Sequence, residues 1–370
     1  RTTRFYVVAG SIKKEITVIM PQPPTANCYI VGEGEHELIV SIKGNGNDGI
    51  APEGKNIVPG NGDAALTPVK IGVIWETEAG LIQLKDAGTG SYVSNTQGRM
   101  TYADYDPNTN SIKYTVNLNG ASIGGVTGGN ALIGAFNDRD QVVWSWHIWV
   151  APDMIDPSTQ EVYEHMVENW TLNDYDVLDR NLGALSNKPE GDNSVASMGL
   201  LYQWGRKDPF IGAGHSNDDF TGTGVLPVVH YYEGWGVQNG GSIRMDDNAI
   251  PTTIQHPTRL VYGGGNSSPT GLSSIPGYGG YLWGTNNGLS TTVKDLGSKT
   301  IYDPCPVGYR VPPVDAFVFS KKGEKEGYRQ GAFIEEITIP KRGSKSYGKP
   351  VYYQRWNSCL LYTSPSPRDS

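Results

Sequence analysis

The chain has 370 residues and a formal net charge of −8, from 38 acidic and 30 basic side chains, and only 18% of its residues are charged. It is long enough for two or three domains of roughly 100–200 residues each. An acidic chain without a cluster of Lys and Arg excludes a nucleic-acid-binding surface. No apolar run reaches the roughly 18–20 residues that a membrane helix needs.

Glycine and aromatic residues dominate the remaining composition. The chain has 48 Gly and 24 Pro, and its aromatic residues are 21 Tyr and 9 Trp against 7 Phe. So many Gly and Pro predict frequent turns between short elements. Tyr and Trp bury a ring and keep a polar atom in water, so they suit half-exposed sheet faces and binding surfaces. This composition, with its low charge, indicates an exported β-protein.

Residues 1–20 alternate between side chains on two faces and turn at Gly10 and Ser11. This pattern predicts a β-hairpin. The prolines between residues 21 and 24 then predict a linker.

The segment 25–150 predicts a β-sandwich, because short strand-like runs follow one another with turn residues between them. A turn cluster at 106–109 is expected to join two paired strands as a hairpin. No part of this segment predicts a long helix. The seven expected strands are residues 27–31, 38–42, 69–75, 92–102, 111–118, 131–137 and 141–150.

A boundary is expected after residue 150. Pro152 and Pro157 interrupt the pattern, and residues 160–170 suit either one short helix or an extended strand. We therefore expect a linker at 151–173 and a new domain from about residue 174.

The second half of the chain carries a series of motifs. They are Asp179-Arg180-Asn181-Leu182-Gly183-Ala184, Gly199 to Phe210 with Trp204-Gly205-Arg206-Lys207-Asp208 at its centre, His256-Pro257-Thr258, Leu282-Trp283-Gly284, and Asp303-Pro304-Cys305-Pro306-Val307-Gly308-Tyr309-Arg310. In this order they resemble the Fibrobacter succinogenes major paralogous domain, found in surface proteins of Bacteroidetes. The family usually has Trp where Tyr309 stands.

This resemblance implies a domain at 174–358 that lacks its last strands. The family is similar to C-type-lectin-like folds, so the resemblance implies an α+β domain with long Gly-rich loops. The fold class expected for the whole chain is therefore mostly β with an α+β C-terminal part, a β-sandwich module followed by a C-type-lectin-like domain.

The resemblance also implies structural signature positions, which are Asp179, Arg180, Asn181, Arg206, Asp208, Cys305 and Arg310. Arg206 and Asp208 are expected to form an ion pair or to anchor a turn, and Arg310 to hold the Pro-rich turn around it.

Three other segments resemble known sequences. Residues 1–20 resemble the end of an immunoglobulin-like module of the BACON type, and 25–150 resembles a further module of Bacteroidetes surface proteins that has no assigned chemistry. Residues 359–370 resemble a translated sequencing adapter, so we leave them out of the fold prediction. We expect the natural chain to extend beyond both ends of this sequence.

The cysteines Cys28, Cys305 and Cys359 have no metal-binding spacing. Cys28 and Cys305 are expected to be two unpaired buried residues in separate domains, since Cys is often buried as a small apolar residue. A disulfide between them is the alternative.

Catalytic and metal-binding patterns are weak. None of the six His lies in a catalytic motif, and His147 and His256 are expected to be structural. Asp104, Asp106, Asn108 and Asn110 begin like a calcium loop, but Thr109 and Thr115 stand where an EF-hand needs Gly and Glu. The loop 215–219 suits a solvated acidic turn better than a cation site. A pair of glycosidase carboxylates would be set by spatial distance, which sequence does not give.

Aromatic residues of the second half are the candidates for ligand binding. Trp235 and Tyr232 lie in a Gly-flanked segment and are the better exposed candidates, because binding residues concentrate on loops. Tyr202, Trp204 and Trp283 could add to a platform on which a sugar stacks, although Trp204 and Trp283 are favoured as core residues.

We expect a secreted or cell-surface, non-catalytic adhesion or glycan-recognition protein. Its partners would be an extracellular glycan or a host or cell-surface protein, and it would need no cofactor and no metal. The alternatives are a structural spacer without a small ligand and, third, a hydrolase whose site the sequence does not reveal.

Overall fold

The computed structural model describes the backbone in segments. They are residues 2–9, 12–19, 26–40, 68–96, 99–156, 158, 178, 180–187, 195–197, 199–200, 202, 205–210, 231–233, 236–238, 243–244, 249–259, 261–262, 283, 301–307, 309–311, 333–338, 350–355 and 360–361. These residues are mostly β-sheet with very little helix, in agreement with the expected mostly-β class.

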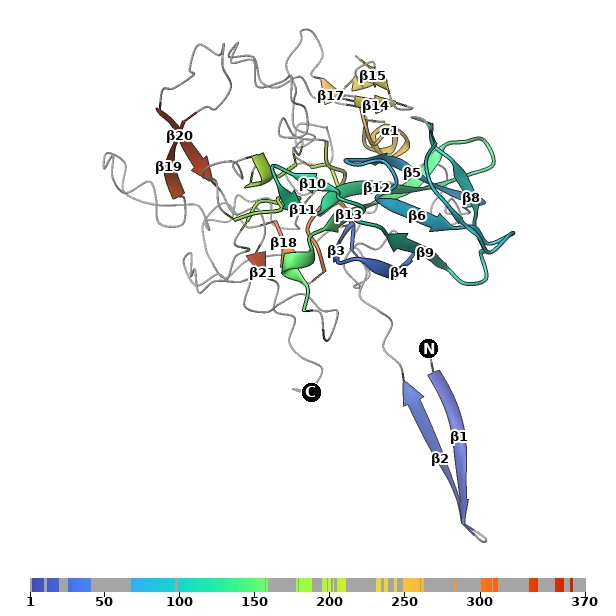
Figure 1. The fold of residues 1–370 in the computed structure, drawn as a ribbon. Coiled ribbons are helices and arrows are strands. Elements are labelled where there is room, and N and C mark those ends of the chain that lie inside the picture. The colour runs from blue at the N-terminus through green and yellow to red at the C-terminus, as the bar shows by residue number, and fades with distance from the viewer. Residues whose placement is uncertain are drawn as a thin grey trace.

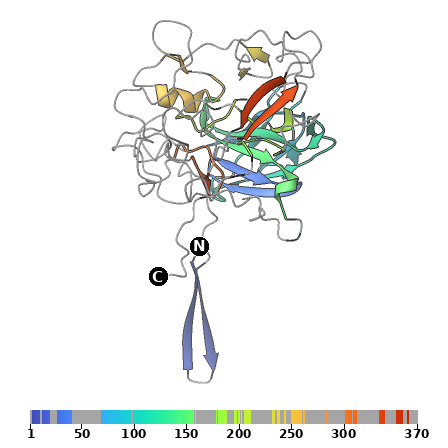
Figure 2. The same cartoon turned by 90° about the vertical axis from the view of Figure 1, so that its left-hand side faces the viewer.

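The predicted N-terminal hairpin is confirmed. Strands β1 (Thr2–Ala9) and β2 (Ile12–Ile19) pair antiparallel from Thr2 with Ile19 to Ala9 with Ile12. Both views show the hairpin apart from the other sheets (Figure 1, Figure 2).

A five-stranded sheet forms the centre of the structure (Figure 1), in the order β3-β13-β12-β5-β8. Its neighbours pair antiparallel, except that β3 runs parallel to β13. The strands are β3 (Cys28–Val31), β5 (Lys70–Glu76), β8 (Tyr102–Asp104), β12 (Gly129–Phe136) and β13 (Val142–Val150).

A second, antiparallel sheet has the order β4-β9-β6-β7. It contains β4 (Gly34–Ile39), β6 (Ile82–Lys85), β7 (Tyr92–Val93) and β9 (Ser111–Val116). In β6 and β9 buried residues mostly alternate with more exposed ones, as expected for a sheet with one face in water. A short hairpin of β10 (Ser122–Ile123) and β11 (Val126–Thr127) follows.

The two sheets bury one common hydrophobic core. Ile71 and Ile133 of the five-stranded sheet belong to the same buried cluster as Leu84 and Ile112 of the four-stranded sheet. Trp146 of β13 is also fully buried in this cluster. Residues two apart on a strand face the same side, so the alternating apolar residues of both sheets build this core.

Strands β12 and β13 are buried along their whole length, which means that both of their faces are covered. On the second face, Trp149 shares a cluster with Leu178, Leu182 and Leu185. Leu132 shares another with Leu200. The described parts of the C-terminal half therefore complete the burial of the central strands.

The C-terminal half also covers the edge of the sheet at β3. Cys28 forms a parallel bridge with Pro306, on the side of β3 that faces away from β13. Ile301 and Tyr302 join the core between the two sheets. The expected division into a module at 25–150, a linker at 151–173 and a domain at 174–358 stays a prediction, but the described residues on either side of that linker share their cores.

The remaining elements are short. A helix α1 (Ala249–Gln255) packs on the central sheet through Ile254, and no helix in the described segments is long and apolar enough to cross a membrane. The others are the 3-10 turns η3 (Pro152–Met154) and η6 (Val195–Ser197) and the strands β14 (Tyr231–Glu233), β15 (Gly236–Gln238), β16 (Ile243–Arg244), β17 (Val261–Tyr262), β18 (Tyr309–Arg310), β19 (Phe333–Thr338), β20 (Pro350–Arg355) and β21 (Leu360–Leu361).

Two expectations for 25–150 are wrong in detail. The run 92–102 is not one strand, because β7 belongs to the four-stranded sheet and β8 to the five-stranded sheet. The residues 106–109 do form a turn, in which the Asp106 carboxylate accepts the Asn108 amide N–H at 2.9 Å. This turn joins β8 to β9, which lie in different sheets, so it crosses between sheets and is not a hairpin.

The cysteines also differ from expectation. Cys28 and Cys305 are both fully buried in one cluster, not in separate cores. Cys28 carries a thiol, whereas Cys305 takes part in a disulfide. The expectation of two unpaired cysteines is therefore wrong for Cys305, and the alternative disulfide between Cys28 and Cys305 is not formed.

Because the C-terminal segments cover the second face of β12 and β13, we predict that a fragment of residues 25–150 does not fold cooperatively by itself. Without its cover it would expose apolar residues of the second face such as Leu132 and Trp149 to water. Near-UV circular dichroism and thermal unfolding of the fragment should show loss of the fixed aromatic environment that the full chain has. A fragment that melts as sharply as the full chain would contradict the shared core.

Candidate functional site

Three polar side chains lie on the covered face of the central sheet. Ser145 and His147 come from β13 and Asn130 from β12, and all three are at most 1% exposed. Alternation along the strands places them beside Trp149, on the face opposite Trp146. A polar group buried this deeply is costly unless it forms hydrogen bonds.

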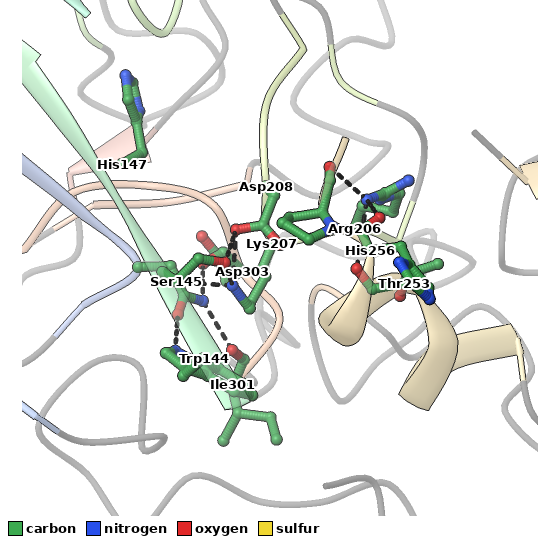
Figure 3. A network of polar contacts seen from close by, with 12 residues as sticks. Trp144, Ser145, His147, Arg206, Lys207, Asp208, Thr253, His256, Ile301 and Asp303 are labelled. Carbon is green, nitrogen blue, oxygen red and sulfur yellow. Dashed lines mark hydrogen bonds and ion pairs between the residues drawn. The ribbon is translucent and has the colours of Figure 1, made fainter. Parts of the chain in front are cut away.

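Ser145 lies in a compact polar cluster with Lys207 and Asp208 (Figure 3). The Lys207 ammonium donates to the Ser145 carbonyl at 2.9 Å, to Ser145 Oγ at 2.6 Å and to Asp208 Oδ1 at 2.6 Å. Ser145 Oγ donates in turn to Asp208 Oδ1 at 2.7 Å. The three acceptors match the three N–H donors of an ammonium group, and the ammonium also lies 4.5 Å from the Trp144 ring centroid.

Burial governs the charge of this cluster. Desolvation lowers the pKa of Lys207 to about 8, although the Asp208 carboxylate acts in the opposite direction and holds the proton. At neutral pH the cluster is therefore a buried ion pair.

A serine hydroxyl beside a lysine of lowered pKa is an arrangement that can generate a nucleophile. Here Ser145 is fully buried and its hydroxyl donates to Asp208. The cluster therefore braces the loop 205–210 against β13.

His147 belongs to a second chain of hydrogen bonds. Asn130 Nδ2 donates to the Gly183 carbonyl at 2.9 Å, so Asn130 Oδ1 is the atom that accepts from His147 Nε2 at 2.9 Å. His147 Nδ1 then accepts from the Tyr202 hydroxyl at 3.5 Å. Burial lowers the pKa of His147 to about 3 and raises that of Tyr202 well above its ordinary value. Both groups are neutral at pH 7, as this chain requires.

Gly183 makes this contact possible. Its φ is +79°, a backbone conformation that favours Gly, and a Cβ atom there would lie 2.5 Å from Leu200 Cγ. The close approach places the Gly183 carbonyl against Asn130 and the Ala184 carbonyl against the indole N–H of Trp149, at 3.1 Å. Residues 183 and 184 of the motif thus dock on β12 and β13 through their backbone carbonyls.

Asn27, just before β3, connects the N-terminal and C-terminal ends of the described core. Its Nδ2 donates to the carbonyls of Ile301 at 2.7 Å and Asp303 at 2.9 Å, and its Oδ1 accepts from the Trp144 indole at 3.2 Å. The buried Asp303 carboxylate accepts the backbone N–H groups of Cys305 and Val311, at 2.8 and 2.9 Å. These contacts fix the signature segment 301–311 at the edge of the sheet.

Arg206 faces away from the ion pair, toward the turn after α1 (Figure 3). Its guanidinium donates to the carbonyls of Pro257 at 2.7 Å, His256 at 3.4 Å, Thr253 and Arg259. The last carbonyls of a helix have no partner within it, and a cation there is favourable. Arg206 is therefore a turn anchor. The expected ion pair of Arg206 with Asp208 is wrong, because Lys207 is the partner of Asp208.

The other signature positions have structural roles where they are described. Arg180 is buried and donates to Asp153 at 2.8 Å and to the Leu185 carbonyl at 3.2 Å. Asn181 accepts the Ala184 N–H through its carbonyl at 3.0 Å. Arg310 pairs through its backbone with Leu360 in β21. Asp179 lies outside the described residues.

The structure does not gather the expected ligand-binding aromatics into one described surface. Tyr202 is partly buried beside Leu200 and bonded to His147, and the Trp283 indole donates to the Arg206 carbonyl at 2.9 Å. Tyr232 lies in β14, where only the backbone is described, and Trp204 and Trp235 lie outside the described residues. Ligand binding by these five residues stays a prediction.

Metal binding finds no support in the described segments, where no three His, Cys, Asp or Glu side chains come together as a metal site would need. Asp106 and Asn108 bond to each other within their turn. The loop 215–219 lies outside the described residues.

Sequence reasoning missed Ser145, Lys207, Asn130 and Asn27. A signal was present in part, because Ser145 and His147 are polar residues within the otherwise apolar strand 142–150. A strand of this kind is buried on both faces, and each polar residue in it then requires a partner.

Comparisons with known proteins return no family model, no curated protein and no solved structure that matches the chain. The resemblance to the Fibrobacter paralogous domain therefore stays a prediction based on its motifs.

We predict that Asp208→Asn destabilises the protein by about 3–5 kcal/mol, because it leaves the buried Lys207 without its counter-charge. The free energy of unfolding from urea titrations at pH 7 measures this loss. The matched control is Asp140→Asn. Asp140 pairs with Lys70, but its side chain is 61% exposed, so its replacement should cost less than about 1 kcal/mol. Equal losses for the two variants would contradict the role of the buried pair.

We predict that His147 contributes to acid sensitivity. Its pKa of about 3 in the folded chain lies below the ordinary value of 6.5. The unfolded chain therefore binds a proton between those values that the folded chain does not, and stability falls as pH falls through this window. His147→Gln keeps a hydrogen-bonding side chain that does not titrate. From pH 7 to pH 4 the variant should lose less unfolding free energy than the wild type, by about 3 kcal/mol. Identical pH profiles would exclude this contribution.

Proposed function

We propose that the chain is a non-catalytic, exported surface protein that recognises a neutral glycan. One observation carries the non-catalytic part. Five side chains of reactive types that lie around the covered face, Ser145, His147, Lys207, Asp208 and Asp303, are at most 3% exposed and bonded to other side chains or to the backbone. Reactive groups need contact with a substrate, and these groups instead hold segments of the chain together.

The glycan part is supported by composition and by the motifs. Tyr and Trp together number 30 residues, and such side chains present rings on which sugars stack. The motifs at 179–184, 199–210 and 303–310 resemble a domain of bacterial surface proteins. The described residues of these motifs dock on β12, β13 and β3, which supports a structural role for the motifs in such a domain.

For the fold in finer detail, we propose a β-sandwich formed by the two sheets, joined to a C-type-lectin-like part from 174 onward. The common core of the four-stranded and five-stranded sheets supports the sandwich. We place the protein at the cell surface or outside the cell, which agrees with the low charge content and the resemblance.

A structural spacer is the second candidate. Among the described residues, Val69 is the exposed large hydrophobic side chain, at 48%. A protein-binding face usually has a larger apolar patch, so the described surface gives little support for protein adhesion. A spacer would need no ligand.

The deciding experiment is binding of the purified 370-residue chain to an array of neutral and acidic glycans, with a parallel pull-down of cell-surface proteins. Glycan recognition predicts saturable binding to a subset of neutral glycans. Unfolded chain on the same array is the control for nonspecific adsorption. Absence of binding in both assays would favour the spacer, and capture of proteins without glycan binding would favour adhesion to protein.

A further inference from the structure

We propose that the outer face of the four-stranded sheet carries a subsite for a neutral sugar ring, which stacks on Tyr92. This inference rests on the proposed glycan recognition and assigns it to residues that the sequence analysis did not select. It places the subsite in the first half of the chain, whereas the aromatic candidates from the sequence lie between residues 202 and 283 of the chain.

Register defines the face. Glu35 on β4 pairs with Thr115 on β9, and Thr115 pairs with Gln83 on β6. In the next row, Glu37 pairs with Lys113, and Lys85 of β6 pairs with Tyr92 of β7. Their neighbours Leu38, Leu84, Ile112 and Tyr114 are buried in the core. The residues of these two rows are exposed or half-buried, so they form the solvent side of the four-stranded sheet. They are Glu35, Thr115, Gln83, Glu37, Lys113, Lys85 and Tyr92.

Tyr92 extends across this face. Its hydroxyl donates to Glu35 Oε1 at 2.7 Å. Tyr92 belongs to β7 and Glu35 to β4, at opposite edges of the sheet with β6 and β9 between them. Adjacent strands are about 4.8 Å apart, so the two side chains must reach toward each other over the intervening strands. The hydrogen bond thereby directs the phenol ring along the sheet surface.

A ring held in this way is prepared for stacking. Tyr92 is half-buried, so part of it stays accessible to solvent. The hydrogen bond to Glu35 restricts its rotation before a ligand arrives, and a side chain that is already ordered loses less entropy on binding. Lys85 Nζ lies 5.7 Å from the ring centroid. Gln83 and Lys113 add hydrogen-bonding groups on the same face, as sites for hydroxyl-rich ligands require.

The balance of side-chain charges on this face favours an uncharged ligand. The face carries two carboxylates, Glu35 and Glu37, and two ammonium groups, Lys85 and Lys113. These charges balance, so the face favours neither an anionic nor a cationic ligand. Apart from the tyrosine ring and the half-buried Ile39 at the end of β4, its outward residues are polar, which does not suit an apolar peptide. A neutral oligosaccharide, with one apolar ring face and many hydroxyl groups, matches both properties.

The test is isothermal titration of the full chain with cellohexaose, xylohexaose and mannohexaose, and with hexagalacturonate as the anionic probe. Tyr92→Ala removes the ring and should weaken binding of the preferred neutral hexaose by at least about tenfold. Tyr92→Phe keeps the ring and loses the hydrogen bond to Glu35, so it should weaken binding by much less.

The matched control is Tyr102→Ala. Tyr102 is also a half-buried tyrosine with a lysine near its ring, Lys70 at 4.3 Å, but it lies on β8 of the other sheet. This variant should bind as the wild type does, with near-UV circular dichroism to confirm that each variant is folded.

The outcomes separate the two proposals. If the wild type binds a neutral hexaose and Tyr92→Ala binds it equally well, the subsite is overturned and glycan recognition stands. The subsite is also overturned if Tyr92→Phe loses as much affinity as Tyr92→Ala, or if hexagalacturonate binds more tightly than every neutral hexaose. If the wild type binds none of the hexaoses, the subsite is overturned, and glycan arrays then decide the proposed function separately.

Discussion

The burial of β12 and β13 on both faces is the constraint on which the rest of the structure depends. One face packs into the core between the two sheets, and the other is covered by segments from the second half of the chain. Three polar side chains lie on that covered face, and each needs a partner from the covering segments. Lys207 with Asp208, Tyr202 and the Gly183 carbonyl supply these partners. Hydrogen bonding therefore specifies where each covering segment docks, and apolar contact supplies most of the stabilisation.

This arrangement shows which contacts the motif residues of the second half make. Gly183 allows a close backbone approach to Asn130, and Asp303 holds its own segment while its carbonyl accepts from Asn27. Arg206 closes the turn after α1. Arg206 and the Asp303 carboxylate bind backbone groups, whereas Gly183 binds Asn130 through its own carbonyl, so each of these residues fixes the path of the main chain. Function, if it follows the proposed subsite, then lies on a different surface, on the opposite side of the four-stranded sheet from the core.

Much of the local structure could be predicted from the sequence. The alternation of side chains between two faces in residues 1–20 correctly predicted the hairpin. The apolar runs predicted the positions of β3, β5, β9, β12 and β13 within a few residues. The segment 92–102 could not be divided correctly, because strand propensity does not tell which sheet a strand joins. The partners of Ser145 and Asn27 could not be predicted either, since they lie 62 and 276 residues away in the chain. Tyr92 was overlooked for the same reason, because the contact of its hydroxyl with Glu35 depends on the order of four strands.

The bond between Asn27 and Asp303 has a consequence for synthesis of the protein. The edge strand β3 follows Asn27 directly, yet the segment that secures it is made about 275 residues later. At roughly 5–20 residues per second, the early strands wait many seconds for that segment. Strands β12 and β13 likewise have one uncovered apolar face until the residues around 178–210 are made, and an uncovered apolar face is a hazard for aggregation. A chain that crosses a membrane unfolded and folds afterwards, with all its segments present at once, avoids this delay.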